Sequence, residues 1–143
     1  MILLDVNILI YAVNRDAPLH SRAKSWLETT ISGAESIGVP WTVFLAFLRL
    51  TTRPGLFRNP MPLDAAFDVI DSWMEQPSVS IIDPGPRHRT ILRGLLSQIG
   101  TGGNLTSDAH LAALALEQRA ELCSCDNDFL RFKGLKWRNP LAS

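Results

Sequence analysis

Short apolar runs alternate with longer amphipathic segments along this chain, and this alternation restricts its fold more than any other feature. Runs that predict strands lie at 2–4, 36–39, 79–82 and 121–124, with an edge strand at 135–137. Segments that predict helices lie at 7–13, 20–31, 41–52, 63–75, 87–99 and 107–118, with one helical turn at 128–132. An unbroken apolar run such as Ile2-Leu3-Leu4 is typical of a strand buried on both faces of a parallel sheet. The order predicts a three-layer α/β/α fold with a short, mainly parallel central sheet of about 4–5 strands.

Size and charge agree with one globular domain. The chain has 143 residues, of which 46% are hydrophobic and 20% are charged, so a single domain spanning 1–143 can bury a core. The formal net charge is zero, so composition alone does not indicate a nucleic-acid binder. An acidic pocket beside a basic rim would still cancel in that sum.

The sequence predicts neither an export signal nor a membrane span. The apolar start lacks a basic region, and the longest nearly apolar stretch, 39–48, is too short to cross a bilayer. The two cysteines, Cys123 and Cys125, belong to no wider disulfide framework. We therefore expect a cytoplasmic protein that makes no membrane contact.

Three aspartates that are far apart in sequence are expected to meet at one edge of the sheet. Asp5 and Asp126 each follow a predicted strand, and ligands of open parallel sheets bind beyond the carboxyl ends of the strands. Asp108 lies in the first turn of helix 107–118, with Thr106 as its expected N-cap, where the helix dipole favours a carboxylate. The same residues have a structural alternative, because Asp5, Asp126 and Asp128 could each cap a following helix.

Clustered carboxylates repel one another unless a divalent cation neutralises them, and oxygen ligands select Mg²⁺ or Mn²⁺. We expect Asp5, Asp108 and Asp126 to hold the ion and Asp128 to support it directly or through water. Such an ion activates water toward a phosphodiester. The acids therefore predict a metal-dependent nuclease.

Four stretches, in order, carry a resemblance to a known family: LLDVN, PWTVFLAFLRLTT, NLTSDAHLAALA and SCDNDFLRFKGLKWRNPL. Together they span nearly the whole chain, which resembles a PIN domain and in particular a VapC-type ribonuclease toxin of a toxin–antitoxin pair. The resemblance implies a PIN-like fold and a single-strand-specific endoribonuclease that uses Mg²⁺ or Mn²⁺. The expected substrate is a structured RNA or a single-stranded loop. The resemblance also implies a homodimer that is inhibited by a cognate antitoxin.

Carried over by position, the family's metal-site acids correspond to Asp5, Asp108, Asp126 and Asp128. The resemblance also implies that Asn7 and Ser124 help to orient the site. The chain departs from the family pattern at Ala46, where many PIN domains have a glutamate. An alternative function is therefore a PIN scaffold that binds RNA or a protein partner with little catalysis.

The helix predicted at 41–52 is very apolar and is expected to be buried and central. Thr42, Ala46 and Arg49 share one face of it, where Thr42 could offer a hydroxyl and Arg49 could meet a phosphate. Its apolar face at 41–50, with the loop near Leu56 and Phe57, is a candidate surface for a dimer or an antitoxin helix.

The basic and aromatic tail at 131–138 is a second candidate for RNA contact, through Lys133 and Lys136. The alternative is an edge strand whose aromatics pack inward and whose charges are solvated. His20, His88 and His110 have no metal-ligand spacing. His110 could assist as an acid or base beside Asp108, but it is expected to be a surface residue of its helix. A phosphoacceptor receiver domain is a third functional class, which ranks low because the chain has no matching late-strand Thr and Lys pair.

Overall fold

The computed structural model describes residues 1–142, in which one five-stranded sheet runs through the centre of the chain's fold. The strands are β1 Ile2–Leu4, β2 Ile37–Pro40, β3 Val79–Ile82, β4 Glu121–Cys123 and β5 Trp137–Arg138. Their order is β3-β2-β1-β4-β5, and every neighbouring pair is parallel. The predicted parallel α/β sheet is confirmed, with strand ends shifted by one or two residues.

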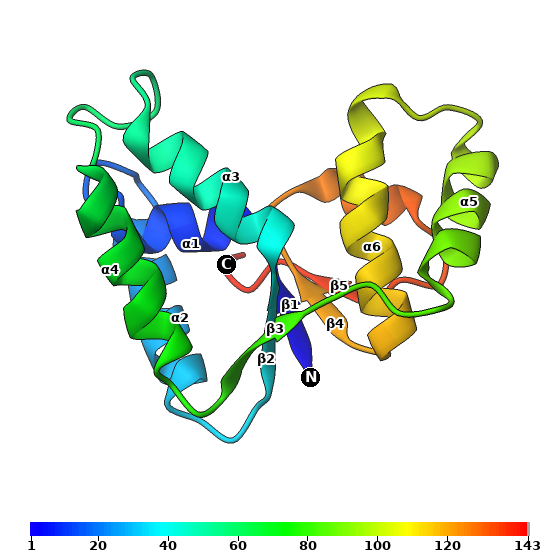
Figure 1. The fold of residues 1–143 in the computed structure, drawn as a ribbon, viewed down its shortest axis with the longest axis horizontal. Coiled ribbons are helices and arrows are strands. Elements are labelled where there is room, and N and C mark those ends of the chain that lie inside the picture. The colour runs from blue at the N-terminus through cyan, green and yellow to red at the C-terminus, as the bar shows by residue number, and fades with distance from the viewer. Residues whose placement is uncertain (143) are drawn as a thin grey trace.

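Helices flank the strands on both sides (Figure 1). On one side lie α1 Val6–Val13, α2 His20–Ile31, α3 Trp41–Thr52 and α4 Leu63–Met74. On the other lie α5 His88–Ile99 and α6 Thr106–Gln118. Two short 3₁₀ helices complete the fold: η1 Gly103–Leu105 directly precedes α6, and η2 Asn127–Arg131 stands where a helical turn was predicted. The result is the predicted three-layer α/β/α arrangement.

The core forms around β1, because this strand has neighbours on both edges and helices on both faces. Ile2, Leu3 and Leu4 are all buried, as the unbroken apolar run predicts. On the α6 side the buried positions include Ala109, Ala112 and Ala113, whose small side chains let the helix backbone approach its neighbours closely. This packing places the first turn of α6 at the carboxyl end of the sheet.

The prediction that helix 41–52 is buried holds for only one side of the helix. In α3, Phe44 and Phe47 are fully buried, but Trp41 is 49% exposed and Leu45 is 57% exposed. A single helix packed on one side of a sheet can cover only one stripe of its own surface, so apolar residues off that stripe stay in solvent. The remaining apolar face is available to a ligand or a partner.

The expected N-cap at Thr106 is wrong. Thr106 is already the first residue of α6, and its backbone N–H donates to the Gly103 carbonyl oxygen. Because η1 runs directly into α6, the first turn is closed by backbone rather than by a side-chain cap. Asp108 nevertheless remains in the first turn, as predicted.

The strand order produces a crevice at the carboxyl edge of the sheet. From β1 the chain crosses to β2 and β3 on one side, whereas β4 and β5 lie on the other side of β1. The ends of β1 and β4 therefore border the point where the strand order reverses, which is where open α/β sheets bind ligands. Separately, no helix among residues 1–142 is long and apolar enough to cross a membrane.

Candidate metal and catalytic site

Asp5 stands at the end of β1 and is the centre of a hydrogen-bond network. One carboxylate oxygen accepts the Val6 backbone N–H at 2.7 Å, so Asp5 caps α1. The other oxygen accepts the Ser124 hydroxyl at 2.7 Å and the Asn7 amide at 3.3 Å. The capping role considered as an alternative for Asp5 is therefore real, and it coexists with a position at the carboxyl edge.

Ser124, immediately after β4, is fully buried and fully hydrogen-bonded. Its Oγ donates to Asp5 and accepts from the Asn7 amide at 3.1 Å and from the Asp126 backbone N–H at 3.0 Å. Asn7 also accepts the Cys125 backbone N–H at 3.2 Å. The Ser124 hydroxyl therefore uses its one donor and both of its acceptor sites. The predicted supporting residues Asn7 and Ser124 tie the ends of β1 and β4 together.

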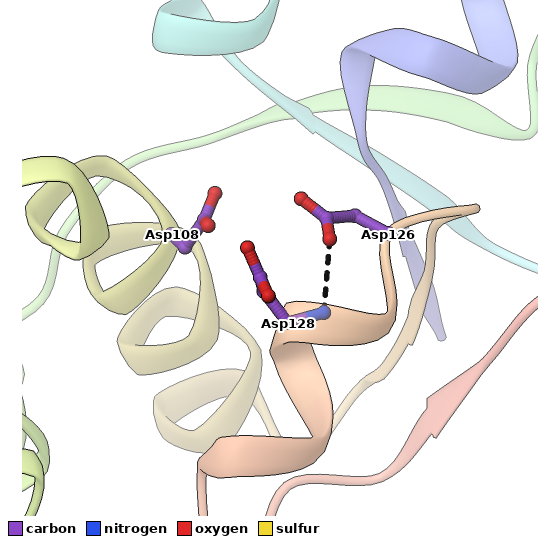
Figure 2. Close-up of side chains that lie close together, drawn as sticks. All are labelled: Asp108, Asp126 and Asp128. Carbon is purple, nitrogen blue, oxygen red and sulfur yellow. Dashed lines mark hydrogen bonds between the residues drawn. The ribbon is translucent and has the colours of Figure 1, made fainter.

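Asp126 and Asp128 come from the turn after β4. The Oδ1 of Asp126 accepts the Asp128 backbone N–H at 2.9 Å, which makes Asp126 the N-cap of η2. Figure 2 shows this bond, with the carboxylates of both residues turned toward Asp108 on α6. The side chain of Asp128 is 50% exposed and has an ion pair at 3.8 Å with Arg131. The short helix η2 therefore orients the carboxylates of Asp126 and Asp128 toward the same space beside Asp108.

The carboxylates of Asp108, Asp126 and Asp128 offer oxygens that all lie within 4.8 Å of one another. Two oxygens bound to one Mg²⁺ at about 2.1 Å are at most about 4.2 Å apart, so small side-chain movements bring these oxygens to one ion. The oxygen-only donor set fits Mg²⁺ or Mn²⁺. This group includes Asp128, which was expected only to support the ion, and it does not include Asp5.

Burial and mutual repulsion raise the pKa of these acids. The pKa of Asp108 rises to about 6, first because burial penalises its charge and then because Asp126, Asp5 and Asp128 are negative neighbours. Burial is also the main cause of the raised pKa of Asp5, with a further contribution from Asp126, against hydrogen bonds that lower it. Asp5 is thus electrostatically part of the acidic site. A divalent cation reverses this repulsion.

A cleft of about 390 Å³ opens beside these acids. Its lining comes from the end of β1, α3 and the start of α6: Asp5, Val6, Thr42, Val43, Leu45, Ala46, Arg49, Ser107, Asp108 and Leu111. The structure therefore brings the predicted face of Thr42, Ala46 and Arg49 into the site. Lys133 and Lys136 do not line this cleft. Lys136 precedes β5, level with the start of β4, and so lies toward the opposite edge of the sheet.

A histidine pair joins α5 to α6, and the sequence contained no spacing that indicated it. His88 Nε2 and His110 Nδ1 lie 2.9 Å apart, and His88 is buried. His110 is half-buried rather than a surface residue, so that expectation is wrong. Burial, and then His88, lower the pKa of His110. The pair fixes α5 against the helix that carries Asp108.

The raised pKa of Asp108 predicts how stability depends on pH without metal. The folded protein binds a proton at Asp108 more tightly than the unfolded chain, so this residue's contribution to stability falls as pH rises from about 4 to about 6. Asp108→Asn should therefore be more stable than wild type above pH 6, by on the order of 1 kcal/mol after solvent screening, and not at pH 4.

Thermal unfolding of both proteins in chelator, between pH 4 and pH 8, measures this difference. His110 contributes in the opposite direction over part of the range, but it cancels because both proteins contain it. Saturating Mg²⁺ at pH 8 should stabilise wild type more than Asp108→Asn. Equal pH profiles for the two proteins would contradict the assignment.

Comparison with known proteins gives consistent matches. A family model described as PIN domain matches residues 2–135. The Mycobacterium tuberculosis protein Ribonuclease VapC37 is 45% identical over 142 residues, covering 99% of this chain and 99% of that protein. VapBC2 from Rickettsia felis, solved bound to a promoter DNA fragment, has a TM-score of 0.72 at 20% identity and covers 97% of this chain and 98% of its own. A toxin–antitoxin complex from Klebsiella pneumoniae has a TM-score of 0.62 at 17% identity, with 98% of each chain covered.

Proposed function

Because the chain belongs to the PIN domain family, we propose that it is a metal-dependent endoribonuclease, the toxin of a VapBC-type toxin–antitoxin pair. The observation that carries the proposal is the meeting of Asp108, Asp126 and Asp128 beside Asp5 at the carboxyl edge of the sheet. The match to a protein named as a ribonuclease, over 99% of both chains, supports RNA as the substrate.

Asp108, Asp126 and Asp128 would hold a Mg²⁺ or Mn²⁺ ion, with Asp5 adding negative charge from the inner side of the cleft. Such an ion polarises a phosphodiester and lowers the pKa of a water molecule. The Asp126 carboxylate is oriented by the Asp128 N–H, and the Asp5 carboxylate is oriented by Val6 and Ser124. These two carboxylates are therefore held in place before any ligand arrives, which lowers the cost of binding.

The reaction is hydrolysis of one RNA phosphodiester. A water oxygen attacks phosphorus, the bond from phosphorus to the leaving oxygen breaks, and that oxygen takes up a proton. One product then ends in a phosphate monoester and the other in a hydroxyl group. Asp5 and Asp108 line the cleft, so their carboxylates are in place to receive the proton that the water loses.

Cleavage of labelled structured RNAs tests the proposal directly. The purified protein should cut RNA in Mg²⁺ or Mn²⁺, should leave it intact in excess chelator, and should recover activity when the ion is restored. Calorimetry should detect the same ions binding in the absence of RNA. Cleavage that persists in chelator, or no cleavage with either ion, would overturn the proposal.

A second candidate is a PIN scaffold that binds RNA or a partner with little catalysis, and the absence of an acid at Ala46 favours it. Ala46 lines the cleft, so this wall of the site contributes no carboxylate at that position. No ion binding at millimolar Mn²⁺, together with retained RNA binding, would support the scaffold.

The same proposal includes a cognate antitoxin as partner, a homodimer, and action in the cytoplasm. The exposed apolar residues Trp41, Leu45 and Leu56 give α3 and its following loop a surface of the kind that partners cover. We expect light scattering to find a dimer, and Trp41→Asp to shift it toward monomer because a buried charge at an interface is costly. A monomer at every concentration would contradict the dimer.

A further inference from the structure

We propose that Arg49 binds the RNA phosphate that neighbours the scissile one, and that Ala46 keeps this arginine free to do so. The inference rests on the proposed ribonuclease function and adds a substrate-binding residue to it. It places the anionic strand along α3, between the acidic edge of the sheet and the far end of the cleft.

Arg49 lies in the same cleft as two of the acids. Arg49 and the acids Asp5 and Asp108 line one cleft, although Arg49 comes from α3 and the acids come from β1 and α6. Thr42, Ala46 and Arg49 follow one another on the same helix face. At 1.5 Å per residue, Arg49 stands about 10 Å further along the helix than Thr42. It therefore extends the cleft beyond the helix start, where a second phosphate would lie.

The Arg49 guanidinium has no ion pair or hydrogen bond within residues 1–142. Its side chain is exposed, so all of its N–H donors are free. It faces a cleft that contains acids, yet it is more than 4.0 Å from their oxygens, since it forms no salt bridge with them. Guanidinium forks bind phosphate oxygens in pairs, and the gap leaves space for such an anion.

The negative charge of the cleft exceeds the charge of one divalent cation. Asp108 has Asp5, Asp126 and Asp128 as negative neighbours. When all four carboxylates are ionised, one divalent cation neutralises about half of their charge, so the cleft still repels an approaching RNA strand. A cation on the opposite wall reduces that repulsion. Lys133 and Lys136 cannot serve this purpose from within the cleft, because they do not line it.

Ala46 explains why Arg49 is not already neutralised. It stands three residues before Arg49 on the cleft face of α3, a spacing at which an acid and an arginine are neighbours and attract each other. The methyl group of alanine cannot do so. The same substitution that removes a possible metal ligand therefore leaves a phosphate-binding cation exposed.

RNA binding measured by fluorescence anisotropy tests the inference. The parent is Asp126→Asn, so that binding is read without cleavage, and the probe is a labelled single-stranded RNA of mixed sequence at fixed Mg²⁺. Arg49→Ala in this parent should weaken binding about tenfold or more, because it loses a charge-assisted contact. The slope of log affinity against log KCl should fall in magnitude by about 0.7, the value for one lost phosphate contact to a single strand.

Arg49→Lys should keep that slope, because the charge remains, but bind more weakly than the parent, because the guanidinium fork is lost. Arg89→Ala is the matched control, since Arg89 is an exposed arginine on α5 that does not line the cleft. It should leave both affinity and slope unchanged. Lys136→Ala provides the same test for the basic tail.

Ala46→Glu distinguishes phosphate binding by Arg49 from the second candidate function, a PIN scaffold whose active site lacks an acid. We expect it to weaken RNA binding as Arg49→Ala does, since the new carboxylate pairs with Arg49, whereas an incomplete active site would gain activity from it. An unchanged salt slope in Arg49→Ala, or an equal loss in Arg89→Ala, would overturn the inference. If wild type cleaves RNA and the salt slope of Arg49→Ala is unchanged, only the role of Arg49 is refuted. If wild type does not cleave RNA, the ribonuclease function itself is refuted.

Discussion

Asp126→Asn is expected to lower the rate of RNA cleavage about a thousandfold or more. The change removes one charged oxygen from the group that would hold the ion, and the electrostatic contribution of a bound ion amounts to several kcal/mol. Each 1.36 kcal/mol lost from transition-state stabilisation is about tenfold in rate. Initial cleavage rates at saturating Mn²⁺ measure the effect, and calorimetry should show weaker ion binding.

The fold of this variant should not change. Asparagine caps helices as well as aspartate does, so its side-chain oxygen can still accept the Asp128 N–H. Asp16→Asn is a matched control, because it removes the same charge at an exposed position outside the cleft. It should cleave RNA like wild type. Wild-type rates for Asp126→Asn would remove this residue from the catalytic machinery.

Asp5→Ala should lower both stability and activity, because Asp5 links the fold to the site. The change removes the cap of α1 and leaves the buried Ser124 hydroxyl without its acceptor. A lost cap costs about 1 kcal/mol, and an unsatisfied buried group about 1–3 kcal/mol more, partly offset by the removal of a desolvated charge. We expect a net loss of about 2 kcal/mol, which lowers the midpoint of thermal unfolding by about 6 °C.

Asp5→Asn distinguishes the structural role from the electrostatic one. Its side-chain oxygen can still cap α1, so its unfolding midpoint should lie between those of wild type and Asp5→Ala, whereas its cleavage should be as low as that of Asp5→Ala. Unfolding curves and cleavage rates on the same preparations supply both readings. Wild-type activity in Asp5→Asn would reduce Asp5 to a helix cap. Wild-type ion affinity with lost cleavage would place Asp5 outside the set of metal ligands.

The sequence and the structure group Asp5 and Asp128 differently within the acidic site, since the oxygens that lie within 4.8 Å of one another belong to Asp108, Asp126 and Asp128. Both residues were expected in the acidic site, but the sequence assigned Asp5 to the ion and Asp128 to its support. Spacing shows that a residue follows a strand, but it does not show where the carboxylate points. That direction depends on η2, whose backbone turns Asp128 back toward Asp108, and on Ser124, which engages an oxygen of Asp5.

In α3, too, the sequence predicted which residues share a face but not the surroundings of that face. Its periodicity placed Thr42, Ala46 and Arg49 on one face, and that grouping holds in the cleft. Periodicity could not decide whether this face met the core or the solvent, because most of the remaining positions of the helix are apolar. The packing of Phe44 and Phe47 against the core settles the rotation of the helix.

By itself the sequence determined the layered fold, because buried parallel strands and amphipathic helices have different periods of apolar residues that can be read locally. It also determined which acids would lie at strand and helix ends, since these positions follow from the element boundaries. Only the tertiary structure decided which oxygens meet, how Arg49 comes to face them across a cleft, and that His88 joins His110. Those relations depend on side-chain directions and on contacts between elements distant in sequence, and no local pattern encodes them.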